Sequence, residues 1–374
     1  KKFEPASVIS VSADGIESEC YFRDIANTPD SAKHTEKCIS DLHETMSYVA
    51  SLDKEIILNF SGGVDSSLLA LLLKELKRDF VLLFAKSRPP YMENYGDYVR
   101  AKAVARYLGI PLREIEVDVD CAPDKMATIV KAMIFDRHVA AYQYFGSMEQ
   151  MGKEFDPDAI VINGQGADSI LTFGPSGRRR ADFIARLLTN RPFGIPARLT
   201  GELVKQLKGR GCRIPKNLTD FLSAFFDSFG YYYPLLSGQD SEDYLRYKEA
   251  LVTRISDRFR HLDSKVMYVE IYGLLQGTDS RVMLKSAQAA GFDNIVMPYK
   301  SPAFIYSTIK YKDKTIDIYN PKYVIHRAIK DLGASLPRAS VRGDVTIPSQ
   351  DGLTRQIKEL YFSESRRIFG SDTV

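Results

Sequence analysis

A short run of small and acidic residues carries the clearest chemical pattern in the chain. It follows the apolar segment 56–60, precedes the leucine-rich segment 68–73, and consists of Ser61, Gly62, Gly63, Val64, Asp65 and Ser66. The first segment predicts a buried parallel strand and the second a helix. A glycine-rich turn between strand and helix binds phosphate, because glycine lets the backbone approach the anion and the helix start supplies N–H groups.

Asp65 gives this turn a second property. A carboxylate inside an anion site repels phosphate unless a cation lies between them, and Mg²⁺ binds through one or two carboxylates plus phosphate oxygens. Asp65 therefore predicts a Mg²⁺ ion. No lysine follows the glycines, so the turn is not a Walker loop.

The segments around this turn alternate between strand and helix patterns. Strands are predicted at 56–60, 80–85, 114–119 and 159–162, and helices at 34–50, 97–108 and 125–150, after a small hairpin within 1–30. This alternation predicts an α/β fold with a doubly wound, mostly parallel sheet. Ligands of such sheets bind at the carboxyl ends of the strands.

A second glycine-rich turn follows the fourth predicted strand. It consists of Asn163, Gly164, Gln165, Gly166, Ala167 and Asp168. Two such turns in one sheet are expected to face one nucleotide, with Asp65 and Asp168 as a pair of Mg²⁺ ligands. The alternative is that Asp168 only caps the helix that follows.

The second half of the chain is predicted to be mostly helical, with helices within 240–290 and at 322–332. A basic segment at 178–216 is either a solvated helix face or a surface for an acidic or carrier-borne substrate. We expect three parts: a lead-in hairpin and helix (1–50), a nucleotide-binding core (51–175) and a helical part that completes the site (176–374).

Composition excludes several classes of protein. The hydrophobic content of 44% and charged content of 26% are ordinary for a globular protein, and no apolar run reaches membrane length. A net charge of +3 is too small to argue for nucleic acid as a partner. The four cysteines are scattered, which argues against a zinc ribbon or an iron–sulfur cluster and favours a reducing cytoplasm.

With both turns, the chain resembles the synthetase domain of asparagine synthetases, which belong to the ATP pyrophosphatases with an adenine nucleotide α-hydrolase-like fold. It is similar as well to β-lactam and carbapenam synthetases and lasso-peptide cyclases. The segment 61–66 resembles the pyrophosphate loop of these enzymes, and 164–168 their second glycine turn. Weaker matches lie at 274–279, 297–299 and 321–328.

The resemblance implies a reaction in which ATP adenylates a substrate carboxylate and releases pyrophosphate, and ammonia or an amine then forms an amide. It implies ATP contacts from Asn59, Ser61, Gly62, Gly63, Val64, Asp65 and Ser66. It further implies that Phe84 or Ala85 borders the adenine, and that Asn163 and Gly164 close the site. The implied partners are a small-molecule or peptide carboxylate and a nitrogen donor.

Several departures from the family pattern affect the chemistry. The glutamine-hydrolysing domain is not in this sequence, so the nitrogen is expected from ammonia, a substrate amine, or a separate glutaminase chain or domain. Gln165 stands where relatives have a glutamate or a catalytic tyrosine, and an amide cannot act as a general base. The family's C-terminal lysine aligns with Arg342, which keeps the positive charge; Arg338 is the alternative.

Two other functions are compatible with the same turn. One is thiolation or modification of RNA through an adenylated base, which the basic segment favours and the absence of paired cysteines disfavours. The other is a non-catalytic binding protein with a degenerate synthetase fold. Gln165 favours a non-catalytic binding protein, whereas the intact Asp65 and Asp168 argue against it.

Overall fold

The computed structural model describes residues 7–13, 15–87, 95–117, 141–171, 222, 239–268, 279–313, 320 and 322–337. The chain divides into two compact units. One comprises Lys1–Ala26 and Thr172–Gly273, and the other Asn27–Leu171 and Leu274–Val374. The boundaries predicted at residues 50 and 175 stay predictions.

The larger unit contains most of the described elements that follow the lead-in hairpin. In chain order they are α1 (Ser31–Ser51), β3 (Ile56–Asn59), α2 (Val64–Glu75), β4 (Val81–Ser87), α3 (Tyr95–Leu108), β5 (Leu112–Val117), α5 (Ala141–Glu154), β6 (Ile160–Ile162), α6 (Ala167–Leu171), α12 (Asp279–Ala289), β7 (Ile295–Val296), η2 (Pro298–Lys300), α13 (Pro302–Tyr311) and α15 (Tyr323–Asp331).

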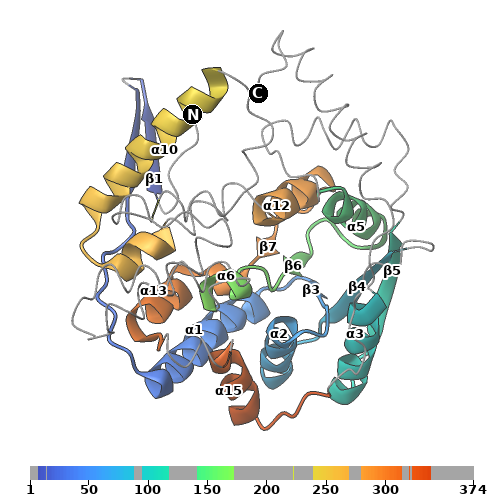
Figure 1. Ribbon diagram of the computed structural model, residues 1–374. Coiled ribbons are helices and arrows are strands. Elements are labelled where there is room, and N and C mark those ends of the chain that lie inside the picture. Colours follow the sequence, from blue (N-terminus) through green and yellow to red (C-terminus); the bar gives the residue numbers. More distant parts are fainter. Residues whose placement is uncertain are drawn as a thin grey trace, which may run out of the picture. The chain divides into compact units, whose positions relative to one another are not determined.

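A five-stranded parallel sheet forms the centre of this unit (Figure 1). Its order is β5-β4-β3-β6-β7, with Ile57 paired to Val81 on one side and to Val161 on the other. The predicted α/β class with a parallel, adenine nucleotide α-hydrolase-like sheet is confirmed. The described part of the second half is mostly helical, and the sequence reading missed its one contribution to the sheet, β7.

Helices cover both faces of the sheet (Figure 1). On one face, Ile57, Leu83 and Val161 pack with Met148 of α5 and Met283 of α12 in a single buried cluster. On the other side lie α1, α2 and α15, which contact one another. The doubly wound arrangement follows from strands that are apolar on both faces.

Most predicted boundaries agree with the structure. The third predicted strand begins earlier, at Leu112, and ends within the described residues at Val117. Of the helix predicted at 125–150, the described residues contain α5, which runs on to Glu154. The helix predicted at 97–108 is α3, and it stops before Gly109, whose φ of +70° suits glycine.

The sequence pattern predicted only some of the residues on the buried face of the long helix α1. The spacing of Ile39, Leu42, Met46 and Val49 predicts that these four residues share the buried face. The last three are buried, but Cys38 takes the position expected for Ile39. The same face continues into His34 and Thr35 at its N-terminal end. A periodicity search over apolar residues passes over these two because they are polar.

His34 makes folding sensitive to acid. It is 2% exposed, and its Nε2 lies 3.5 Å from the Oγ1 of Thr308 on α13. Burial and the nearby charge of Lys312 lower the pKa of His34 from 6.5 to about 3. The unfolded chain therefore binds this proton at a higher pH than the folded chain, and the stability that neutral His34 provides is lost as the pH falls from 6.5 towards 3.

We expect His34→Gln to flatten the acid side of the stability curve. In wild type this histidine alone should lower the free energy of unfolding by about 1.4 kcal/mol per pH unit below roughly pH 6. Urea unfolding at a series of pH values measures the difference between the two curves. His43→Gln, on the same helix but half-buried, is the control; parallel wild-type and His34→Gln curves would contradict the assignment.

The described part of the smaller unit contains the hairpin and one long helix. Strands β1 (Ser7–Ser12) and β2 (Gly15–Cys20) pair antiparallel, as predicted, with Val11 opposite Ile16. Helix α10 (Gln239–Arg258) precedes a cluster in which the ring of Phe22 packs edge-on against Phe259 and Tyr268. No described helix combines the length and apolar character needed to cross a bilayer.

Candidate active site

The topology of the sheet places both glycine-rich turns in one crevice. From β3 the chain adds β4 and β5 on one side, and then β6 and β7 on the other. The point between β3 and β6 is therefore the switch point, where the strand order reverses and where ligands of such sheets bind. Asn59 ends β3 and Asn163 follows β6 at this point.

The two turns lie close together. A Cβ atom added to Gly164 would lie 3.6 Å from the Cβ of Asp65 and 3.6 Å from the backbone nitrogen of Ser66. The structure thus brings the second turn against the first.

A cavity of about 320 Å³ opens beside the two turns. This volume lies at the lower end of the range for small-molecule sites. The predicted site residues that line it are Asn59, Ser61, Asp65, Ser66, Phe84, Ala85, Asn163 and Gly164. Its other described lining residues are Phe60, Leu83, Ser147, Met148, Gln165 and Gly166. Ser147 and Met148, from α5, were not predicted.

The first turn is braced by its own serines. The hydroxyl of Ser66 donates to the carbonyl of Gly63 at 3.2 Å, and the N–H of Gly63 donates to the hydroxyl oxygen of Ser61 at 3.3 Å. Gly63 is the N-cap of α2 and offers no side chain to the first-turn N–H groups. The start of α2 is consequently arranged to receive an anion from outside the helix.

Gly62 is required by its surroundings as well as by its backbone. Its φ is +68°, and a Cβ atom there would lie 2.5 Å from the backbone nitrogen of Ala101 in α3. Gly62, Gly63 and Val64 are absent from the described cavity lining, so the first two act by shaping the turn.

Lys322 holds the carboxylate of Asp65. Its ammonium group donates to Asp65 Oδ2 at 2.5 Å, and the two side chains are only 17% and 18% exposed. Lys322 is the N-cap of α15 with a φ of +61°, a left-handed conformation that is unusual for a non-glycine residue. Its side chain pairs with Asp65 and does not cap its own helix.

Tyr299 fixes the backbone of the same residue. The ring is fully buried, and the hydroxyl donates to the carbonyl oxygen of Asp65 at 2.8 Å. Burial and the charge of Asp65 raise the pKa of Tyr299 well above 10, so the hydroxyl stays protonated and remains a donor at neutral pH. Asp65 is thus fixed at both its carboxylate and its carbonyl.

A Mg²⁺ ion bound mainly by a nucleotide fits this donor set. Asp65 supplies one carboxylate in the first turn. Mg²⁺ in nucleotide sites is bound by one or two protein carboxylates together with phosphate oxygens. Among the described residues there is no group of three or more His, Cys, Asp or Glu residues that would hold a metal by itself. The backbone of Asp168 lies in α6, but its side chain is outside the described residues, as are Arg338 and Arg342.

The second turn is hydrogen-bonded to β7 and lies beside the side chain of Lys300. The N–H of Asn163 donates to the carbonyl of Val296 at 2.9 Å, and Asn163 Oδ1 accepts from the N–H of Gln165 at 2.8 Å. Gly166 has a φ of +102°, and a Cβ atom there would lie 2.8 Å from the Cγ and Cε atoms of Lys300. Gln165 lines the cavity, where its amide offers hydrogen bonds but no base.

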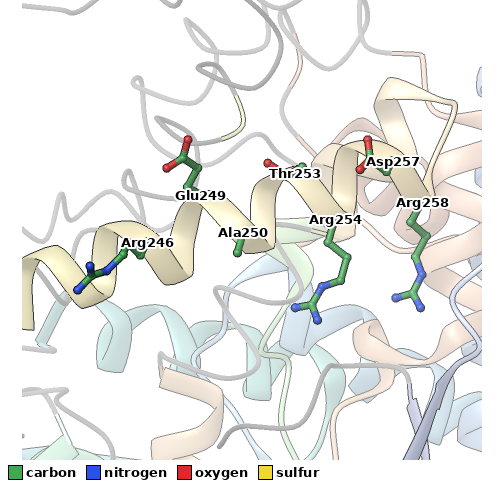
Figure 2. Close-up of a pocket in the computed structure, with 7 residues that line it drawn as sticks. All are labelled: Arg246, Glu249, Ala250, Thr253, Arg254, Asp257 and Arg258. Atoms are coloured by element: carbon green, nitrogen blue, oxygen red, sulfur yellow. The ribbon is translucent and has the colours of Figure 1, made fainter.

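A second hollow, in the smaller unit, lies along α10 and has a different character. Figure 2 shows Arg246, Ala250, Arg254 and Arg258 in one row along the helix and Glu249, Thr253 and Asp257 in the next. Its described lining comes from one helix, is exposed and carries both signs of charge. Because this lining is one exposed helix face, the crevice at the switch point, where the predicted site residues of both turns meet, is the candidate active site.

Comparison with known proteins identifies the family of the chain. The family profile described as asparagine synthase matches residues 41–269, which include both turns. The chain belongs to the asparagine synthase family. Members of this family use ATP, and the matched residues include the turn from Ser61 to Ser66.

Individual similarities are to RNA-modifying enzymes. A stretch of 147 residues is 29% identical to the tRNA-specific 2-thiouridylase MnmA of Ureaplasma urealyticum. It covers 35% of this asparagine synthase family chain and 34% of the thiouridylase, so the chain spans about a third of that relative's length. The structure of the U34-tRNA thiolase NcsA from Methanococcus maripaludis aligns over 88% of this chain and 89% of its own, with 11% identity and a TM-score of 0.23, too low to support any argument.

Two residues of the site were missed as functional by the sequence reading. Lys322 and Tyr299 lie in segments that resemble family motifs, but nothing local indicates that they hold Asp65. Each lies more than 230 residues from it along the chain, at separations of 257 and 234. A lysine and a tyrosine beside prolines in the helical half were the available clues.

Proposed function

We propose that this protein is an ATP-dependent carbon–nitrogen ligase of the asparagine synthetase type. A substrate carboxylate oxygen attacks the α-phosphorus of ATP, and the bond to the β-phosphate oxygen breaks and releases pyrophosphate. The nitrogen of ammonia or an amine then attacks the acyl carbon, loses a proton and displaces AMP. The observation that carries the proposal is the close approach of the two glycine turns, which line one cavity at the switch point.

The roles of the residues follow from their positions. The N–H groups at the start of α2, with Ser61 and Ser66, bind the terminal phosphates. Phe84 and Ala85 of β4, together with Met148 of α5, border the adenine. Asn163 and Gly164 close the crevice over the nucleotide.

Asp65 and Asp168 are proposed as the Mg²⁺ ligands. The ion, when bound, neutralises the charge of the phosphates. Lys322 balances the charge of Asp65 and holds its carboxylate at the turn, while Tyr299 keeps the backbone of the turn in place. Catalysis in such a site consists mainly of positioning and charge neutralisation.

The proposed partners are a small-molecule or peptide carboxylate and ammonia or an amine, with a separate glutaminase as a further source of nitrogen. Gln165 cannot remove a proton from the attacking amine, so the proton must leave to another group. Arg342 is proposed to supply the positive charge of the family's C-terminal lysine. The proposed compartment is a reducing cytoplasm.

RNA modification is the second candidate function. It is favoured by the 29% identity to a tRNA-specific 2-thiouridylase, because both chemistries begin with adenylation by the same kind of loop. Of the described cysteines, Cys38 is buried in α1 of the larger unit, and Cys20 lies in the smaller unit beside the hydroxyl of Tyr268.

Exchange of labelled pyrophosphate into ATP tests the proposal. The full chain with Mg²⁺ is incubated with a panel of amino acids, dicarboxylates and carboxylate peptides, and separately with bulk tRNA. We expect at least one carboxylate to drive exchange and, with ammonium present, to give an amide by mass spectrometry. Exchange driven by tRNA and by no carboxylate would replace the ligase with the RNA-modifying enzyme.

A further inference from the structure

Helix α3 lies directly against the first glycine-rich turn (61–66). The backbone of α3 sets the distance between the helix and the turn. A Cβ atom on Gly62 would lie 2.5 Å from the nitrogen of Ala101, 2.6 Å from its Cα and 2.7 Å from the carbonyl carbon of Arg100. All three are main-chain atoms, so the start of the Arg100 side chain is fixed relative to the turn by helix packing.

The guanidinium group of Arg100 points back over the turn. Its Nη1 atom lies 4.0 Å from the place that a Cβ atom on Gly63 would occupy. Gly63 is the N-cap of α2, where the first-turn N–H groups begin. A permanent positive charge with a planar set of donors therefore lies beside a helix start that already favours anions.

Arg100 also has a partner on its own helix. Nη1 lies 3.2 Å from Asp97 Oδ1, and the two side chains are 38% and 49% exposed. An exposed pair of this kind contributes at most about 1 kcal/mol to stability. Because a guanidinium has several N–H donors and Asp97 contacts one nitrogen, the pair orients the group and leaves donors for a phosphate.

The position of Arg100 indicates which part of a nucleotide it would meet. Arg100 is not among the described residues that line the cavity beside Phe84 and Ala85. A nucleotide with its base in that cavity and its phosphates at the turn would bring its terminal phosphates, and neither its base nor its ribose, towards Arg100.

We propose that Arg100 binds the terminal phosphates of the nucleotide and the pyrophosphate formed from them, and so favours a triphosphate over a monophosphate. This inference rests on the proposed function for the identity of the ligand. It adds to that function a residue outside the two glycine turns, placed there by the contact between α3 and Gly62.

Calorimetric titration of MgATP, magnesium pyrophosphate and AMP, without carboxylate substrate, tests this role. Arg100→Gln should weaken the binding of ATP and of pyrophosphate by about tenfold to a hundredfold, the effect of losing one charge-assisted contact. It should leave the affinity for AMP unchanged. Arg100→Lys should fall between wild type and Arg100→Gln, because it keeps the charge without the fork. Arg106→Gln, exposed at the far end of α3, should bind all three as wild type does.

The melting temperature of each variant checks that α3 is intact. If Arg100→Gln weakens the binding of ATP and of AMP equally, Arg100 only supports the structure. If the binding of ATP and pyrophosphate is unchanged, Arg100 does not belong to the site. Failure of the wild-type chain to bind ATP and pyrophosphate would instead overturn the proposed function, and this inference with it.

Discussion

Asp65→Asn should reduce carboxylate-dependent pyrophosphate exchange by about a thousandfold or more, the loss expected when phosphate charge is no longer neutralised in place. Asparagine has nearly the same shape as aspartate but carries no charge, so the phosphates lose a metal ligand and Lys322 loses the carboxylate 2.5 Å away. Breaking this largely buried pair should also lower the free energy of unfolding by roughly 2 kcal/mol. Exchange rates and denaturant unfolding measure the two effects separately. Asp168→Asn should likewise abolish exchange.

Asp158→Asn is the matched control for this experiment. Asp158 also accepts from a lysine, Lys54, at 2.6 Å, but it is 68% exposed and lies at the other end of β6. Removing its charge should leave exchange unchanged and have little effect on stability. If Asp65→Asn exchanges pyrophosphate at the wild-type rate, Asp65 is not a ligand of the metal.

The second large effect is expected for Gly62→Ala, which should destabilise the protein by about 3–5 kcal/mol. A left-handed φ of +68° disfavours alanine by about 1 kcal/mol, and the added methyl group would overlap main-chain atoms of Ala101 and Arg100. Since these atoms belong to α3, relief requires the helix and the phosphate turn to move apart. The free energy of unfolding in urea and the affinity for ATP should fall together.

Gly109→Ala isolates the contribution of that contact. Gly109 has nearly the same φ, +70°, but a Cβ atom there would meet nothing within 4 Å. It should lose only about 1 kcal/mol, the backbone term alone. Equal losses in the two variants would mean that α3 does not press against the turn as the structure has it.

Features that depend on contiguous residues could be predicted from the sequence alone. The strand, glycine turn and helix from Ile56 to Glu75 were predicted because apolar runs and glycines act over a few residues. The second turn, the hairpin and helix α3 were predicted for the same reason. These local features were enough to predict the parallel sheet and to place the candidate site at the carboxyl ends of its strands.

Which distant groups meet at that end depends on how the helices and strands pack. Strand β7 contains just Ile295 and Val296, too few residues to show a period, and it joins the sheet through bonds to β6. The pairing of Lys322 with Asp65 depends on the packing of α15 against α2. The place of Arg100 depends on how closely α3 approaches Gly62. A sequence pattern records spacing along the chain, whereas these contacts are set by the packing of helices and strands, and so they became visible only in the folded protein.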